Sequence, residues 1–302
     1  LATNVNGGAN TALGSGALYT MNPASDALTY NTAVGFDAGN DITTGIQNTI
    51  IGSLAGDALT DADLNVTVGY NSLGTDTKGS KSTAIGNNAL GDQNFTSSTD
   101  SHNTAVGYNA GTRITTGIRN TIMGSEAGDA LTDADYNIAI GYQALSTDTQ
   151  GSRSVAIGYQ ALEFQNFTSA TDSKNVAVGF NCGVAVSTGT LNTFMGYNAG
   201  AANTTGYDNI IIGRDGGVDD ANNGSSCITG YRNILIGNAG SLSATDGIHQ
   251  ITLGSNIIGA NSSFTFGNGG TDSRISVGAT SITAPSDERY KEEITTSTAG
   301  LS

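Results

Sequence analysis

Clusters of oxygen-bearing side chains in this chain are of the kind that could hold a calcium ion. The run DALTDAD occurs at 57–63 and again at 129–135, and GRDGGVDDANNG occupies 213–224. Calcium binds about six to eight oxygen ligands, mostly carboxylates and carbonyls. None of these runs has the spacing of an EF-hand loop, so we interpret them as solvated turns and predict no metal site and no cofactor.

Side chains that could act as acids, bases or nucleophiles are scattered along the chain. His102 and His249 are isolated, and we expect both to be surface or loop residues. Cys182 and Cys227 are too far apart for a metal knuckle and are predicted to be small buried apolar residues. No pair of carboxylates stands out as the acid and base of glycoside cleavage. We therefore predict that the protein is not an enzyme acting on an external substrate.

A charged segment near the end of the chain, SDERYKEEI at 286–294, differs from everything before it. Ser286 is a good helix N-cap, and Asp287 and Glu288 suit the positive end of a helix dipole. Lys291 follows one turn later. The sequence therefore predicts the start of a short helix at this point.

The elements that position all these residues must be unusual, because the composition is unusual. Among 302 residues there are 43 Gly, 2 Pro and no Trp, and only 12% are charged. Disordered chains combine high net charge with few β-branched residues, whereas Val, Ile and Thr are abundant and evenly spread here. We therefore predict regular β-structure.

The charge and the apolar runs limit the partners. A net charge of −15 would repel a phosphate backbone, so we expect no nucleic acid partner. No apolar run approaches the roughly 20 residues that span a bilayer, so we expect no membrane insertion. The sequence begins at Leu1 rather than Met, and we expect the native amino terminus, with any signal or anchor, to lie upstream.

A short repeat dominates the chain. Asn or a similar polar residue, three mostly β-branched or small apolar residues, and Gly recur fourteen times, as in NTAVG at 31–35 and 103–107. Successive units start 17 or 21 residues apart, with one step of 24, and three steps of 17 plus one of 21 give a super-repeat of 72. Units this short must stack on one another, so we predict a parallel β-solenoid over residues 10–255.

The alternation inside each unit predicts two different faces. The second and fourth positions share one face of the strand, and the fourth is always a large aliphatic residue or Met. The third position is often Ala and points the other way. We expect the aliphatic face to fill the core of the coil and the Ala face to approach another element closely. The recurring Asn is predicted to form internal amide ladders, because stacking repeats each side chain at strand spacing.

Two surface features could serve recognition. The aromatic residues after the corner Gly, such as Tyr142 and Tyr159, are expected to form a structural stack, with sugar stacking as the alternative. The 21-residue units insert QNFTSSTDS at 93–101 and QNFTSATDS at 165–173, and extra residues in a solenoid leave the rod as loops. The candidate receptor-binding residues in these loops are Asn94, Phe95, Asn166 and Phe167. A loop that bridges neighbouring chains would have the same appearance.

The repeats resemble a known family of fibres. NTAVGYNAG at 103–111 and SVAIGYQAL at 154–162 are similar to the head repeats of trimeric autotransporter adhesins and to repeats of phage tail-fibre proteins. The resemblance implies a left-handed β-roll fold, a homotrimer and attachment to a host surface glycan or protein receptor. It implies a location on a virion tail fibre or at an extracellular cell surface. The expected function is a receptor-binding fibre of the phage type, with a cellular trimeric adhesin and a polysaccharide-degrading tailspike as alternatives.

The final segment, APSDERYKEEI at 284–294, resembles the opening of the intramolecular chaperone of phage tailspike endosialidases and tail fibres. In that family a Ser and a Lys five positions apart cleave the chain before the Ser after the trimer has folded. The resemblance implies that Ser286 is the nucleophile and Lys291 the base of a single self-cleavage. A hydroxyl needs such a neighbouring base because it is a poor nucleophile while protonated.

The expected organisation is therefore all-β with four parts. Residues 1–9 form a lead-in, 10–255 the β-solenoid, 256–285 a β-rich transition and 286–302 the beginning of a chaperone domain. The apolar residues of one 17-residue unit are too few to offset the conformational entropy of ordering it, which favours burying a second face between chains.

Overall fold

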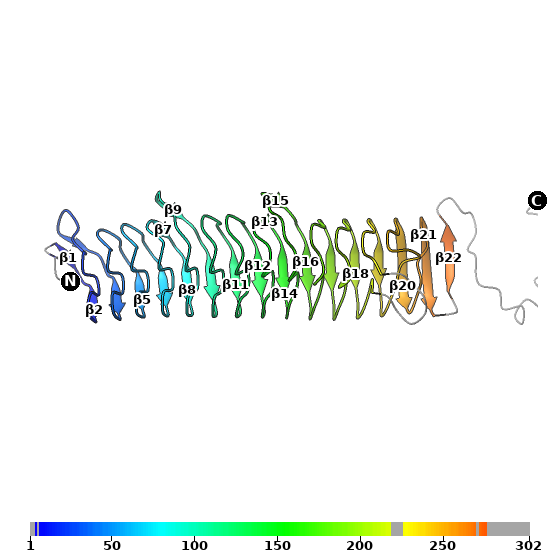
Figure 1. Ribbon diagram of the computed structural model, residues 1–302, viewed down its shortest axis with the longest axis horizontal. Coiled ribbons are helices and arrows are strands. Elements are labelled where there is room, and N and C mark those ends of the chain that lie inside the picture. Colours follow the sequence, from blue (N-terminus) through cyan, green and yellow to red (C-terminus); the bar gives the residue numbers. More distant parts are fainter. Residues whose placement is uncertain (1–3, 5, 219–225, 270–271, 277–302) are drawn as a thin grey trace, which may run out of the picture.

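The computed structural model describes residues 4, 6–218, 226–269 and 272–276 as a straight, narrow rod (Figure 1). The rod is a parallel β-solenoid of about 15 coils, as the repeat predicts. The described residues contain no helix. They accordingly contain no helix of the length and apolarity that crossing a bilayer requires. The helix predicted at Ser286 lies outside the described residues, as does Lys291.

Each coil contributes one short strand to a single long sheet of sixteen strands. In order along the sheet these are β2 (Thr11–Leu13), β4 (Thr32–Val34), β5 (Thr49–Ile51), β6 (Val66–Val68), β8 (Thr83–Ile85), β10 (Thr104–Val106), β11 (Thr121–Met123), β12 (Ile138–Ile140), β14 (Val155–Ile157), β16 (Val176–Val178), β17 (Thr193–Met195), β18 (Ile210–Ile212), β19 (Ile234–Ile236), β20 (Gln250–Ser255), β21 (Ser263–Asn268) and β22 (Ser273–Ser276). All neighbours are parallel except β22, which runs antiparallel to β21.

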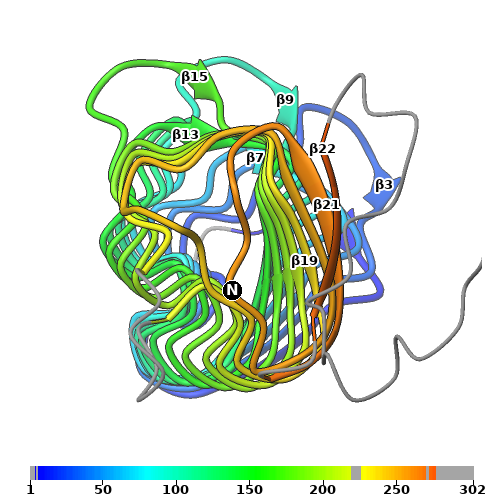
Figure 2. The same cartoon turned by 90° about the vertical axis from the view of Figure 1, so that its right-hand side faces the viewer.

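Three further strand pairs lie beside the main sheet. They are β1 (Gly7–Gly8) with β3 (Ala27–Leu28), β7 (Gly79–Ser80) with β9 (Thr99–Asp100), and β13 (Gly151–Ser152) with β15 (Thr171–Asp172). The second strand of each pair belongs to the inserted residues of a 21-residue unit. Figure 2, viewed from the end of the rod, shows that the β9 and β15 segments project beyond the outline of the other coils. We call 96–100 and 168–172 the flaps.

The strands pair without offset, so equivalent residues form straight columns. Thr104, Ala105 and Val106 pair with Thr121, Ile122 and Met123, and the same register continues along the chain. A residue type that recurs in the unit therefore recurs every ~4.8 Å along the rod.

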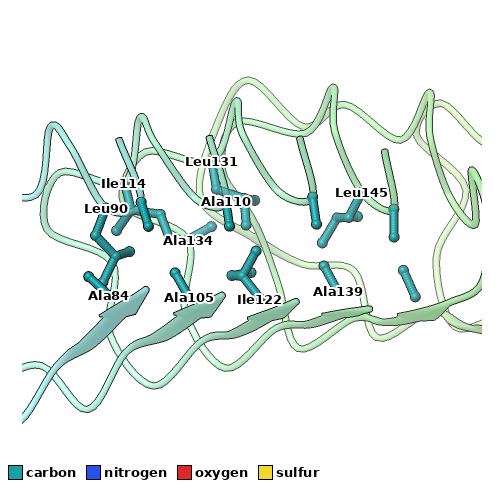
Figure 3. Packing of buried hydrophobic residues seen from close by; sticks show 14 of the residues in the cluster. Ala84, Leu90, Ala105, Ala110, Ile114, Ile122, Leu131, Ala134, Ala139 and Leu145 are labelled. Atoms are coloured by element: carbon teal, nitrogen blue, oxygen red, sulfur yellow. The ribbon is translucent and has the colours of Figure 1, made fainter. Parts of the chain in front are cut away.

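The prediction that the aliphatic face of the strand fills the core is wrong. The third position points inward, and Ala105 and Ala139 are completely buried. Figure 3 shows Ala139 facing Leu145, and Ile122 of the preceding coil facing Leu131, from opposite walls of the coil. The inward position holds Ala in some coils and a larger residue in others: Ile122 and Leu131, on opposite walls of one coil, are both completely buried. The second and fourth positions consequently point outward.

The corner Gly after each strand allows neighbouring coils to approach closely. Gly124 has φ of +136°, and a Cβ atom there would lie 2.5 Å from the carbonyl oxygen of Gly141. Both the positive φ and the contact exclude other residues at this corner.

The predicted amide ladder is confirmed. The Asn120 side chain accepts the backbone N–H of Asn137 at 2.9 Å and donates to the carbonyl of Ala134 at 2.8 Å. Asn103 accepts in turn from the backbone N–H of Asn120 at 2.9 Å. These buried bonds join consecutive coils and close each coil across its interior.

Two of the three 21-residue units, those starting at 82 and 154, occur where the ladder lacks an Asn. Ser82 and Ser154 replace the ladder Asn, and Gln93 and Gln165 fill the gap from the inserted segment. Gln165 donates to Asp148 at 2.5 Å and accepts from Asn175 at 2.7 Å. The four extra residues thus bring a longer amide into the coil as well as forming a flap.

Candidate functional site on the outer face of the sheet

The outer face of the main sheet is an apolar stripe along the rod. Its fourth-position residues are Leu13, Val34, Ile51, Val68, Ile85, Val106, Met123, Ile140, Ile157, Val178, Met195, Ile212, Ile236 and Leu253. Many are well exposed, including Met123 at 45% and Leu253 at 49%. The second positions of these strands are Thr, Val or Ile, so no charged side chain interrupts the stripe between β2 and β20. A continuous exposed apolar surface of this length is typical of an interface.

One edge of the stripe is formed by the residue that precedes each ladder position. We call this set the leading column: Tyr30, Gln47, Leu64, Lys81, His102, Arg119, Tyr136, Arg153, Lys174, Leu191, Asp208, Arg232 and His249. All have positive φ, which turns the chain into the strand, and all but the half-buried Asp208 are exposed. The predicted surface positions of His102 and His249 are therefore confirmed.

The other edge is formed by the residue that follows each corner Gly. We call this set the trailing column: Phe36, Ser53, Tyr70, Asn87, Tyr108, Ser125, Tyr142, Tyr159, Phe180, Tyr197, Arg214, Asn238 and Ser255. Tyr142, Tyr159, Phe180 and Tyr197 are stacked, with ring centroids 5.4, 4.8 and 5.4 Å apart. Because each ring face covers the next, the rings present mainly their edges to the outside. This arrangement fits the expected structural stack better than a platform for sugars.

The leading column concentrates positive charge in an acidic protein. Lys81, His102, Arg119, Arg153 and Lys174 follow one another along the rod, interrupted only by Tyr136. The guanidinium groups of Arg119 and Arg153 lie 5.3 and 5.4 Å from the centroid of the Tyr136 ring on neighbouring coils. Tyr136 thus separates two cations that would otherwise be adjacent.

Carboxylates of the flaps partly neutralise this column. Asp100 forms an ion pair with Lys81 at 2.5 Å, and Asp172 pairs with both Arg153 and Lys174, the latter at 3.3 Å. The Lys81 hydrogen bond holds the pKa of Asp100 below its usual value. The flaps are therefore attached to the leading edge of the stripe by exposed ion pairs, which are individually weak.

The four predicted binding residues lie at the base of the flaps. The side chains of Phe95 and Phe167 are buried, at 6% and 8% exposure. The backbone N–H of Asn94 donates to Thr115 of the next coil at 2.9 Å, as Asn166 does to Ser187. The exposed surface of each flap is instead formed by its tip, Thr96–Ser97–Ser98 in one and Thr168–Ser169–Ala170 in the other.

Both DALTDAD runs lie within the described residues, whereas the second half of the run at 213–224 lies outside them. The described residues contain no group of three or more His, Cys, Asp or Glu side chains that could hold a metal ion. In the DALTDAD runs, burial raises the pKa of Asp57 and of Asp129, and nearby carboxylates raise both further.

The two cysteines are buried, as predicted, and neither is in a disulfide. Burial raises the pKa of Cys182 to about 12 and that of Cys227 to about 11, so both are protonated and unreactive at neutral pH.

The outer stripe was missed as a site because its side chains were assigned to the core. The sequence does contain a signal for this stripe. The fourth position never carries a charge. The leading and trailing residues of each coil are six positions apart, and the two columns differ from each other in residue type. For Ser286 and Lys291 the predicted self-cleavage lies outside the described residues. No known protein family, curated protein or solved structure matches the chain.

Proposed function

We propose that this chain forms the shaft of a parallel homotrimeric fibre, of the phage tail-fibre type or a similar appendage, that attaches to a host cell surface. The observation on which this proposal depends is the uninterrupted apolar stripe on the outer face of the sheet. Leaving Val, Ile and Met half exposed on every coil is costly in water, and covering them with further copies of the same chain removes that cost along the whole rod.

The width of the stripe supports three chains. A leading residue such as Tyr136 and the trailing residue of the same coil, Tyr142, are six residues apart. The face between them is therefore at most about 20 Å wide. Three such faces arranged as a triangle lie about 6 Å from a common axis, a distance that Val, Ile and Met side chains fill. Four faces would lie about 10 Å from the axis and would leave an open channel.

The flaps support attachment as the role of the fibre. A rigid rod holds their tips at intervals of 72 residues, which is about 19 Å along the axis. Their exposed hydroxyl groups suit hydrogen bonding to a host surface glycan or to a protein receptor. Loops on a rigid scaffold are the usual location of such recognition.

Assembly is tested by size-exclusion chromatography with multi-angle light scattering. We expect three times the chain mass for the wild type and the single-chain mass for Met123→Lys, because a charge in the stripe must be desolvated on assembly. Thr116→Lys, at an exposed position away from the stripe, is the matched control and should remain trimeric. A monomeric wild type would contradict the proposal.

Attachment is tested by measuring adsorption to host cells. We expect Gly-Ser replacement of both flap tips to reduce binding at least tenfold while the trimer stays intact. The same replacement at the exposed Thr188 and Thr205 should have no effect. Unchanged adsorption after flap replacement would remove the flaps from the proposal, and depletion of a host glycan during incubation would favour an enzyme instead.

The self-cleavage remains a proposal that rests on the resemblance of the final segment. Mass spectrometry of a full-length chain should show loss of the part that begins at Ser286. Both Ser286→Ala and Lys291→Ala should leave the chain intact. An uncleaved wild-type chain inside a folded trimer would overturn it.

A further inference from the structure

We propose that the leading column of one copy pairs with the trailing column of the next, coil by coil, in a seam that fixes the chains parallel and without axial offset. This inference rests on the proposed homo-oligomer and specifies how its copies contact one another. It follows from the chemistry of the two edges of the stripe, which face outward on every coil.

The geometry places the leading residue of one copy and the trailing residue of the next at the same position along the rod axis. We call each such position, one per coil, a height. Each strand is preceded by one leading residue and followed by one trailing residue, and the sheet register has no offset. Copies related by rotation about an axis parallel to the rod therefore bring a leading residue next to the trailing residue that flanks the equivalent strand. A closed ring allows no translation along the axis, so equal heights must meet.

The charged members of the two columns meet complementary partners. Arg153 would meet the ring of Tyr159, and Lys174 the ring of Phe180. Cations over aromatic rings are favourable when partly desolvated. Two coils beyond Lys174, Asp208 would meet Arg214, and these two side chains are opposite in charge. This is the only one of the described heights at which the trailing residue is charged or the leading residue is acidic.

The remaining heights are also compatible. Apolar or aromatic residues meet aromatic residues at Tyr30–Phe36, Leu64–Tyr70, Tyr136–Tyr142 and Leu191–Tyr197, and His102 meets Tyr108. Polar residues meet polar residues at Gln47–Ser53, Lys81–Asn87, Arg119–Ser125, Arg232–Asn238 and His249–Ser255. Like charges meet at none of the thirteen heights. Cyclic parallel packing therefore satisfies every described position of the two columns.

Antiparallel packing lacks this match. Two face-to-face rods of opposite direction would bring leading column against leading column. With full overlap Arg119 would lie opposite Arg153. Juxtaposed like charges cost free energy at an interface and select against that orientation.

Existing ion pairs within one chain do not occupy these groups fully. Asp208 is 3.7 Å from Arg232, and Arg214 is 3.5 Å from Asp215, with both arginine side chains more than half exposed. Asp172 lies beside Arg153 and Lys174 but leaves their side chains about half exposed. Exposed ion pairs of this kind contribute little to stability, so the cations remain able to contact an aromatic ring of the neighbouring copy.

Disulfide trapping tests the seam. In the full chain carrying Arg153→Cys and Tyr159→Cys, we expect mild oxidation to give covalently linked trimers, because the two positions meet between copies. A disulfide within one chain would leave the single-chain mass, so only contact between copies gives linked trimers. The matched control, Arg153→Cys with Tyr197→Cys, places the partner two coils away and should stay unlinked.

The energetic test reverses one charge of the seam. Lys174→Glu should weaken assembly about tenfold or more, since each copy contributes one such contact to the ring. Lys78→Glu is the control, because Lys78 likewise lies near an aspartate, 3.9 Å from Asp61, but belongs to neither column. It should change assembly less than twofold. Far-UV circular dichroism of each variant verifies that the rod is folded, and Lys174→Gln repeats the test with a milder change.

The outcomes separate the two proposals. A monomeric wild type would overturn the homo-oligomer and the seam together. A trimer that shows no link at 153–159, or that links equally at 153–197, would overturn the seam alone. A disulfide between single-variant Arg119→Cys and Arg153→Cys chains would show antiparallel packing and also overturn it.

Discussion

At the scale of single residues, the recurring Asn joins the coils and closes each one. It is buried, and its amide group uses both its oxygen and its nitrogen within the ladder. A buried amide without partners would destabilise the rod, so the ladder also limits which registers the coils adopt.

Removing one ladder amide tests this role. Asn120→Ala leaves the backbone N–H of Asn137 and the carbonyl of Ala134 without their side-chain partner. We expect a loss of about 2 to 4 kcal/mol in the free energy of unfolding. Urea denaturation followed by circular dichroism measures it. Thr116→Ala, four residues before Asn120, is at an exposed position and should change stability by less than about 0.5 kcal/mol.

The pKa of Asp129 predicts a pH dependence. Burial raises this pKa in the folded rod, and Glu126 raises it further. The folded state then binds the proton more tightly than the unfolded chain. Stability from this group is therefore greatest below the unfolded pKa, falls as the pH rises through the window between the two values, and stays low above it.

Asp129→Asn should consequently raise the melting temperature at pH 7 by a few degrees. The gain should shrink when the melt is repeated at pH 3, where the wild-type carboxyl is largely protonated in both states. Asp133→Asn, at an exposed position of the same run, is the control. An equal gain at both pH values would contradict burial of the charge as the cause.

At the scale of elements, the 21-residue units combine a structural and a surface role. In the units that start at Ser82 and Ser154, a Gln replaces the missing ladder amide. The Gln contacts a buried Asp of the preceding coil that is held by backbone N–H groups: Asp148 accepts from Gly151 at 3.0 Å and from Phe167 at 2.9 Å. The flap can therefore vary at its tip while its base remains part of the coil wall.

This division predicts that the base of the flap is sensitive and its tip tolerant. Gln165→Leu would leave the Asp148 carboxylate without its 2.5 Å side-chain donor and Asn175 without its acceptor. We expect a loss of about 3 kcal/mol or more in thermal or urea unfolding. Gln150→Leu, at a half-exposed position in the preceding coil, should be close to neutral. Equal effects would contradict the role of Gln165.

At the scale of the whole molecule, the proposed assembly is lateral. Each rod already has a length of about 70 Å from ~15 stacked coils. Copies that share the apolar stripe thicken the rod without extending it.

Small-angle X-ray scattering distinguishes these shapes. We expect the assembled wild type and the Met123→Lys monomer to have nearly the same maximum dimension, while the cross-sectional radius of the assembly is larger. The reason is that the stripe runs parallel to the axis of the rod. A maximum dimension that doubles or triples on assembly would indicate end-to-end contacts and contradict the seam.

The sequence predicted the repeat, the parallel solenoid, the amide ladder and the burial of both cysteines. These properties depend on local alternation and on stacking of equivalent residues, so spacing alone reveals them. The flaps were predicted from the four extra residues, but the burial of Phe95 and Phe167 was not, because an insertion pattern does not distinguish its base from its tip.

Only the tertiary structure decided which face of each strand is inside. Ala105 lies on the same face of the strand as Asn103, whose buried amide donates across the coil to Gly117, so Ala105 faces the core and Val106 faces outward. Alternation defines two faces but does not assign them; the hydrogen bonds that the ladder amides form across the interior of the coil make that assignment. The same decision turned an apparent core residue into part of the outer stripe, and placed Arg153 and Tyr159 at its two edges.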